Sequence, residues 1–149
     1  MEQITVLPMA AAHIRSVAAL EQACFSTPWS AAALAEELDN PPAVFRLAVD
    51  AAGTVLGYMG MHHVGDEGFV TNVAVHPAAR RRGVAAALLA YMADYAAENR
   101  LYRITLEVRV SNTAAIALYE GAGYVRDGVR PGFYRNPTED AAIYSRYFQ

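Results

Sequence analysis

The spacing of apolar side chains predicts short strands and helices along the first third of the chain. An apolar run at 4–7 predicts a first strand. Residues 10–24 carry apolar side chains at roughly helical spacing, which predicts a helix. A second helix begins either with Pro28 as its first residue or with Ser30 as its N-cap, and it runs through Leu38.

The middle of the chain is predicted to hold four strands and the longest helix. Three strands are expected at 44–49, 55–64 and 69–75, with turns rich in Gly and Asp between them. The longest helical pattern then covers 83–99. Residues 104–110 alternate strictly between apolar and polar, which predicts a strand with one buried face.

The last third of the chain is predicted to hold one short helix and two strands. Asn112 is placed to cap a helix over 113–120, which ends at glycines. Strands are expected near 124–129 and 141–148. The mixture of helices with antiparallel hairpins predicts an α+β fold, and the length predicts a single domain over 1–149.

The strand at 69–75 leads into a basic turn at the start of the long helix. The turn holds three consecutive arginines, followed by Gly83 and, two positions later, Ala85. A helix start presents unpaired N–H groups and a partial positive charge, and small residues let a phosphate approach the backbone. The pattern indicates a diphosphate site, while three adjacent arginines by themselves are also typical of a solvated turn.

The strand at 104–110 and the helix after it indicate a second candidate site. Apolar residues alternate with Glu107 and Arg109 along the strand, so these two charged side chains share one face. The helix is short enough for Tyr119, near its end, to lie back against the sheet. A carboxylate and a phenol that border one cleft can accept and donate protons.

These segments resemble the GNAT superfamily of acetyl-CoA-dependent N-acetyltransferases and, within it, the bacterial ribosomal-protein-alanine N-acetyltransferase (RimI) family. The resemblance covers nearly the whole chain, and its most diagnostic block lies at 106–120. Further blocks are an N-terminal signature at 21–30, a coenzyme motif at 72–85 and a C-terminal signature at 130–141.

The resemblance implies a GNAT fold, with a mixed, mostly antiparallel sheet that is splayed at the acetyl-CoA site and flanked by helices. Acetyl-CoA, as co-substrate, is expected between the strands at 69–75 and 104–110, and no metal is implied. For Asn112, a role as a helix N-cap is as consistent with the sequence as a contact with the coenzyme. The residues expected to contact the coenzyme are Val73, Ala74, Val75, Arg80, Arg81, Arg82, Gly83, Val84, Ala85, Ala86 and Asn112.

The implied reaction is attack of a neutral amine on the thioester of acetyl-CoA. The amine is mostly protonated at neutral pH and needs a base, for which Glu107 is the candidate, directly or through a water. The departing thiolate needs a proton, for which Tyr119 is the candidate. Considered separately, Glu107 is typical of an exposed carboxylate on a strand and Tyr119 of a core residue. Their joint occurrence in the diagnostic block favours a catalytic role for both.

The implied acceptor is a protein N-terminal α-amine, namely the N-terminal alanine of ribosomal small-subunit protein eighteen. Trp29, Glu21 and Tyr134 are expected to bind this substrate. Two residues depart from the family pattern. Ala85 replaces a second Gly and is a tolerated variant, whereas Phe133 replaces a Tyr and removes a possible hydroxyl contact in the acceptor cleft.

Two other functions fit the same residues. A GNAT enzyme that acetylates a small amine or another protein would keep the catalytic block, because acceptor choice is expected in the loops around Trp29 and 133–134. A catalytically silent acyl-CoA-binding subunit would keep the arginine turn but has no need of Glu107 and Tyr119.

Composition excludes several other chemistries. The 149 residues include no lysine, so a Schiff base on a lysine and a P-loop lysine are both impossible. The net charge of −3 argues against direct nucleic-acid binding. The chain has no apolar run long enough to span a membrane and no signal-peptide pattern at its start, which predicts a cytoplasmic protein.

Three further side chains are given structural roles. Cys24 is expected to be a small buried residue rather than a nucleophile. The adjacent His62 and His63 are expected to face opposite sides of a strand and to hold no metal. The sequence leaves the oligomeric state open.

Overall fold

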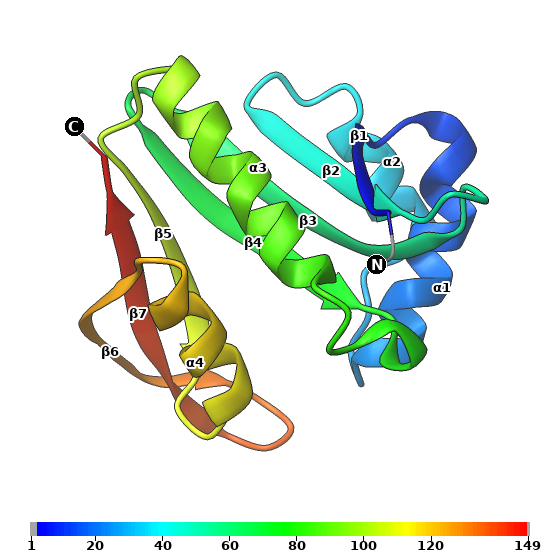
Figure 1. Cartoon of the computed structure of the whole chain (residues 1–149). Coiled ribbons are helices and arrows are strands. Elements are labelled where there is room, and N and C mark those ends of the chain that lie inside the picture. The colour runs from blue at the N-terminus through cyan, green and yellow to red at the C-terminus, as the bar shows by residue number, and fades with distance from the viewer. Residues whose placement is uncertain (1–2, 149) are drawn as a thin grey trace.

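The computed structural model describes residues 3–148, which form a seven-stranded mixed sheet with helices on both faces (Figure 1). Met1 and Glu2, where the signal-peptide expectation begins, and Gln149, the last residue of the predicted domain, lie outside the described residues. The strands are β1 (Thr5–Pro8), β2 (Ala43–Val49), β3 (Val55–Val64), β4 (Glu67–Val75), β5 (Arg103–Arg109), β6 (Val125–Tyr134) and β7 (Glu139–Tyr147). The helices are α1 (Ile14–Cys24), α2 (Ala31–Glu37), α3 (Val84–Glu98) and α4 (Thr113–Gly121), with 3-10 turns at Ala11–His13 and Pro77–Ala79.

Side-chain caps decide where two of the helices begin. The Ser30 hydroxyl accepts a hydrogen bond from the backbone N–H of Ala33 at 3.0 Å, so Ser30 is the N-cap of α2 and the alternative start at Pro28 is wrong. The Asn112 side chain accepts from the backbone N–H of Ala115 at 3.2 Å and caps α4 in the same way. The other predicted elements are confirmed to within a few residues at their ends, except for β6.

Strand β6 is longer than the pattern at 124–129 predicts. The Pro131-Gly132 pair breaks the alternation, because proline donates no backbone hydrogen bond and Gly132 adopts a positive φ of 59°. Pairing with β7 shifts there and resumes at Tyr134, opposite Glu139. Phe133 and Tyr134, which the sequence places in a loop, therefore lie at the end of a strand.

The strands follow the order β1-β2-β3-β4-β5-β7-β6, and β4–β5 is the one parallel pair among the described strands. This pair ends where Phe69 lies opposite Thr105. Beyond that point β4 continues along β3 as far as Val75, and β5 continues along β7 as far as Arg109. The two strands therefore part, and the sheet opens between them (Figure 1).

A β-bulge in β4 sets which face its side chains occupy. The pairing with β3 skips Thr71, which is an extra residue on β4. Val70 and Val73 consequently both pack with the cluster on the α3 side of the sheet, although they are three positions apart. Asn72 and Ala74 face the other side, toward α1.

Two hydrophobic clusters attach the helices to the two faces of the sheet. On one face α3 and α4 bury apolar residues that include Leu88 and Met92, both fully inaccessible. On the other face α1 and α2 contribute Val17 and Leu34, which pack with Phe45 of β2. Within residues 3–148, no helix combines the length and the apolar character needed to cross a membrane.

Gly57 of β3 lies where β3, β4 and the start of α3 meet. A Cβ at this position would be 2.8 Å from the carbonyl oxygen of Ala74 and 2.9 Å from Cγ1 of Val84. Gly57→Ala therefore has to displace backbone as well as a buried side chain. We expect it to lower the free energy of unfolding by about 1–3 kcal/mol, measured by urea denaturation.

Gly121→Ala is the matched control for this substitution. A Cβ at this exposed position in the last turn of α4 meets no atom within 4 Å, and alanine favours a helix over glycine. This variant should keep its stability or gain up to about 1 kcal/mol. An equal loss from both variants would contradict the close packing of β3 against β4.

Candidate active site

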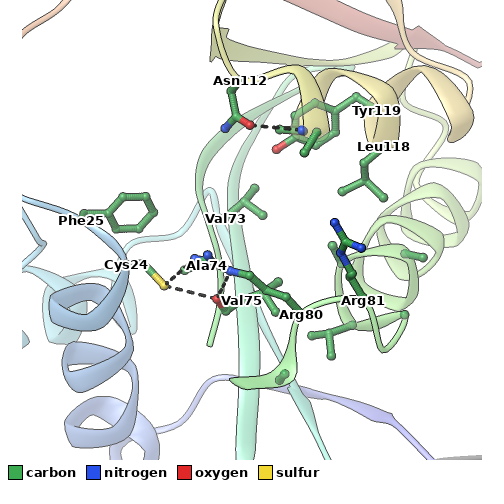
Figure 2. Close-up of a pocket in the computed structure, with 17 residues that line it drawn as sticks. Cys24, Phe25, Val73, Ala74, Val75, Arg80, Arg81, Asn112, Leu118 and Tyr119 are labelled. Carbon is green, nitrogen blue, oxygen red and sulfur yellow. Dashed lines mark hydrogen bonds between the residues drawn. The ribbon is translucent and has the colours of Figure 1, made fainter. Parts of the chain in front are cut away.

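A cavity of about 640 Å³ opens between β4, the start of α3 and α4 (Figure 2). Figure 2 shows Asn112 and Tyr119 at the α4 end and Arg80 and Arg81 at the foot of α3. Arg82 does not line this cavity, and its Nη1 donates to the carbonyl of Ala78 at 3.5 Å. The other residues predicted to contact the coenzyme all line the cavity: Val73, Ala74, Val75, Arg80, Arg81, Gly83, Val84, Ala85, Ala86 and Asn112.

The start of α3 has the geometry of an anion site. Arg81 and the N-cap Gly83 both adopt left-handed backbone conformations, with φ of 64° and 79°. Left-handed residues in such a turn direct successive N–H groups toward one point. The N-cap makes no side-chain hydrogen bond, so the first-turn N–H groups and the positive end of the helix dipole face a prospective phosphate.

Cys24, at the end of α1, contacts the open edge of β4. Its thiol donates to the carbonyl of Val75 at 3.3 Å, and Nε of Arg80 donates to the same oxygen at 3.4 Å. Nη2 of Arg80 is 3.9 Å from the sulfur. The prediction that Cys24 is buried is wrong: α1 ends beside the opening in the sheet, and the side chain is half-buried in the cavity wall.

A second cavity, of about 610 Å³, lies between β4, β5, the end of α1 and the segment 134–139. Glu107 and the three residues predicted to bind the acceptor, Glu21, Trp29 and Tyr134, all line it. Both cavities share a set of wall residues, which marks their junction at the parting of β4 and β5. The shared residues are Cys24, Phe25, Val73, Asn112 and Tyr119.

Glu107 forms an ion pair across the sheet. Its Oε2 lies 2.6 Å from Nε of Arg130, and the Glu107 side chain is 27% exposed. Arg130 belongs to β6, so the pair spans the intervening strand β7. Sequence reasoning placed Arg130 only in a family signature and missed this contact, because a pairing across a third strand leaves no local pattern.

Tyr119 is buried at the junction of the two cavities. Only 7% of the residue is exposed, and its ring packs 6.0 Å from that of Tyr124. Burial, with a smaller effect of nearby Tyr134, raises the pKa of Tyr119 to about 12. The phenol is therefore protonated throughout the neutral range and is able to donate a proton to a basic group.

Glu21 is a buried carboxylate with both oxygens engaged. Oε1 accepts from the backbone N–H of Trp29 at 2.9 Å, and Oε2 accepts from the Tyr58 hydroxyl at 2.5 Å. Glu21 is only 2% exposed. Burial, followed by the bond to Glu21, raises the pKa of Tyr58 far above its usual range. Glu21 thus fixes the loop before α2 against β3, and the Trp29 ring packs on Phe45 at 6.4 Å.

Arg109 holds the segment 134–139 against the second cavity. Its guanidinium donates to the carbonyls of Pro137 and Arg135 at 2.9 and 2.8 Å and lies 4.5 Å from the centre of the Tyr134 ring. It also pairs with Glu139, which in turn accepts from the backbone N–H of Ser111. The bond from Ser111 and the Arg109 charge hold the pKa of Glu139 below its usual range.

Three other expectations concern residues around the sheet. His62 and His63 face opposite sides as predicted, toward Glu37 and Tyr95 respectively. Phe133 does not line the second cavity; instead it lies under the Arg130 guanidinium, 5.6 Å from the ring centre. In residues 3–148, no three His, Cys, Asp or Glu side chains are grouped closely enough to hold a metal.

The model of the Acetyltransferase (GNAT) family matches residues 14–124, which include both cavity walls on β4 and β5. The chain belongs to this family. Its members use acetyl-CoA as the acetyl donor, and the residues that the family resemblance assigns to that substrate line the first cavity, with the exception of Arg82. The predicted GNAT fold is confirmed by the open, mixed seven-stranded sheet.

Similar proteins include N-acetyltransferases of ribosomal proteins. The crystal structure of the ribosomal-protein-S18-alanine N-acetyltransferase from Escherichia coli superposes with a TM-score of 0.89 at 28% identity, over 97% of this chain and 94% of that one. N-alpha-acetyltransferase RimI of Mycobacterium tuberculosis is 34% identical, over 94% of this chain and 90% of its own. An uncharacterized protein of Mycobacterium leprae is 36% identical over 99% of this chain, which spans only 42% of that protein.

Arg109→Met should loosen the segment 134–139 without unfolding the sheet. The substitution removes hydrogen bonds from a charged donor to two backbone carbonyls and Glu139, each worth about 1.5–3 kcal/mol. Amide hydrogen exchange in this segment should become about tenfold faster or more. Arg103→Met is the matched control, because Arg103 lies on the same strand as Arg109 but pairs with Glu67 of β4 and does not contact the segment. If amide hydrogen exchange in the segment 134–139 is unchanged in Arg109→Met, Arg109 does not hold the segment in place.

Proposed function

We propose that this protein transfers the acetyl group of acetyl-CoA to a protein N-terminal α-amine, namely the N-terminal alanine of ribosomal small-subunit protein eighteen. One observation carries the proposal: a cavity lined by the coenzyme motif meets a second cavity at Tyr119, between the parted strands. The alanine of protein eighteen is taken from the name of the E. coli protein, and the name of the M. tuberculosis protein also gives an α-amine as acceptor. Such a substrate places the enzyme in the cytoplasm, where ribosomes are assembled.

In this proposal acetyl-CoA occupies the first cavity. The pantetheine arm pairs with the open edge of β4 at Val73–Val75, as an added strand would. The backbone N–H groups at 81–86 hold the pyrophosphate, and Arg80 and Arg82 add positive charge. Asn112 serves both as the cap of α4 and as part of the coenzyme wall.

Glu107 is the proposed base. The acceptor amine enters the second cavity as an ammonium and gives one proton to the Glu107 carboxylate, directly or through a water. The neutral nitrogen then forms a bond to the acetyl carbon while the bond from that carbon to sulfur breaks. A backbone N–H near Ala74 or Val75 stabilises the developing oxyanion. Arg130 holds the carboxylate in position through the 2.6 Å ion pair.

Tyr119 is the proposed acid. It lines both cavities, so its hydroxyl is in reach of a group that leaves from their junction. Its pKa of about 12 keeps the proton on the phenol at neutral pH, so the hydroxyl is available to donate to the departing thiolate. The thiolate takes that proton and leaves as a thiol. The acylated nitrogen loses its second proton through solvent, which restores the proton of Tyr119, and Glu107 releases the first proton to solvent.

An acetylation assay across acceptor classes tests the proposed acceptor. We expect mass spectrometry to show transfer from acetyl-CoA to peptides that begin with the N-terminal sequence of protein eighteen. A peptide whose only amine is an internal lysine should react far more slowly, because the lysine amine is harder to deprotonate. Transfer to small amines but to no peptide would overturn the proposal, and so would coenzyme binding without any transfer.

Glu107→Gln should lower kcat by about 10²–10⁴-fold, the usual contribution of a general base. The affinity for acetyl-CoA should stay the same, because Glu107 lies outside the first cavity. The measurements are steady-state kinetics at saturating substrates and acetyl-CoA binding by calorimetry.

Glu67→Gln provides the matched control for this variant. Glu67 makes an equivalent ion pair with Arg103 at 2.9 Å but lines neither cavity, so its loss should leave kcat unchanged. Full turnover in Glu107→Gln would show that another group removes the proton.

A further inference from the structure

Asn72 of β4 carries a buried oxygen that is unpaired. The residue is 7% exposed, it lines the second cavity, and its Oδ1 has no hydrogen-bond partner among the described residues. An unsatisfied buried carbonyl is costly, and native structures tolerate it mainly where a ligand or water supplies the donor. Asn72 therefore requires an explanation that the packing of the chain does not provide.

The neighbours of Asn72 determine which atom of its side-chain amide has no hydrogen-bond partner. The Tyr58 hydroxyl gives its hydrogen to Glu21, so the phenol oxygen can only accept a further bond. Asn72 makes a side-chain hydrogen bond with Tyr58, so its amide must be the donor in that contact. The amide NH₂ is thus directed at Tyr58, and the remaining atom is an acceptor. A ligand for it must bring an N–H or O–H group.

The position of Asn72 is set by the parting of the strands. Asn72 lies three residues beyond Phe69, and Glu107 lies two residues beyond Thr105, the last pair that joins β4 to β5. The bulge at Thr71 turns Asn72 to the face toward α1, and both Asn72 and Glu107 line the second cavity. An amine that enters this cavity therefore has Asn72 on one strand and Glu107 on the other.

We propose that Oδ1 of Asn72 accepts a hydrogen bond from the attacking α-amine and so selects primary amines; this inference rests on the proposed function. After Glu107 has taken one proton, a primary amine keeps two N–H groups and a lone pair. One N–H bonds to Asn72, which neither gains nor loses a proton. This bond orients the lone pair of the nitrogen toward the acetyl carbon. The proton of the second N–H group is the one that the nitrogen loses when the amide forms.

Asn72→Leu tests the inference, because leucine keeps the approximate size and removes the acceptor. We expect kcat/KM for an alanine-starting peptide to fall about tenfold, mainly through the peptide KM, with the acetyl-CoA KM unchanged. The second substrate is the same peptide beginning with N-methylalanine, whose secondary amine has one fewer N–H. The preference of the wild type for the primary amine should shrink by about tenfold in the variant.

Three further variants separate ligand binding from a structural role. Asn72→Ala also lacks the acceptor, and it cannot overfill the site if leucine prevents folding. Asn72→Asp keeps an oxygen at the same place and should retain the preference for the primary amine. Tyr58→Phe removes the oxygen that orients the Asn72 amide, so it should weaken the preference for the primary amine without abolishing it.

The outcomes distinguish this inference from the proposed function. If the wild type acetylates the peptide while both variants without an acceptor keep its preference for primary amines, the inference fails and the proposed function stands. Equal losses on both peptides would assign Asn72 a structural role and would also overturn the inference. If the wild type acetylates no peptide, the proposed function fails. This outcome is measured on the wild type alone and does not depend on the variants.

Discussion

The parting of β4 and β5 is the constraint on which the rest of the structure depends. Backbone N–H and C=O groups along a strand need partners, and among the described strands β4 has none on its β5 side beyond Phe69. An open edge inside a sheet is a place for an extended ligand to pair. The same opening joins the two cavities at Tyr119, so a donor and an acceptor that approach from separate sides can meet there.

Polar contacts between distant segments hold the two sides of this opening. On the β4 side, Glu21 ties the loop at Trp29 to Tyr58. On the β5 side, Arg109 ties the segment 134–139 to the strand. Both contacts involve a charged group that is buried or half-buried, where hydrogen bonds are stronger than in water. Hydrogen bonds of polar side chains, as well as hydrophobic packing, therefore set the shape of the second cavity.

Local patterns in the sequence were sufficient for most of the fold. The alternation at 104–110 correctly assigns Leu106 and Val108 to the core and Glu107 to the cavity face, because side-chain direction in a strand depends only on position. Asn112 could be identified as a cap from residue type and spacing, whereas Ser30 was one of two possible starts of its helix. The end of β6 could not be predicted, since its last residues are held by pairing of Tyr134 with Glu139 across an irregular turn.

By itself the sequence determined most of the elements, the family, and all but one of the residues expected in the first cavity, because each depends on short-range spacing or on a recognisable motif. Only the tertiary structure decided the partners of those residues. It paired Glu107 with Arg130 across a third strand, engaged both oxygens of Glu21, and left the oxygen of Asn72 unsatisfied. Such contacts join residues that are far apart in the chain. Their geometry follows from strand order, a bulge and the parting of two strands, which no local pattern records.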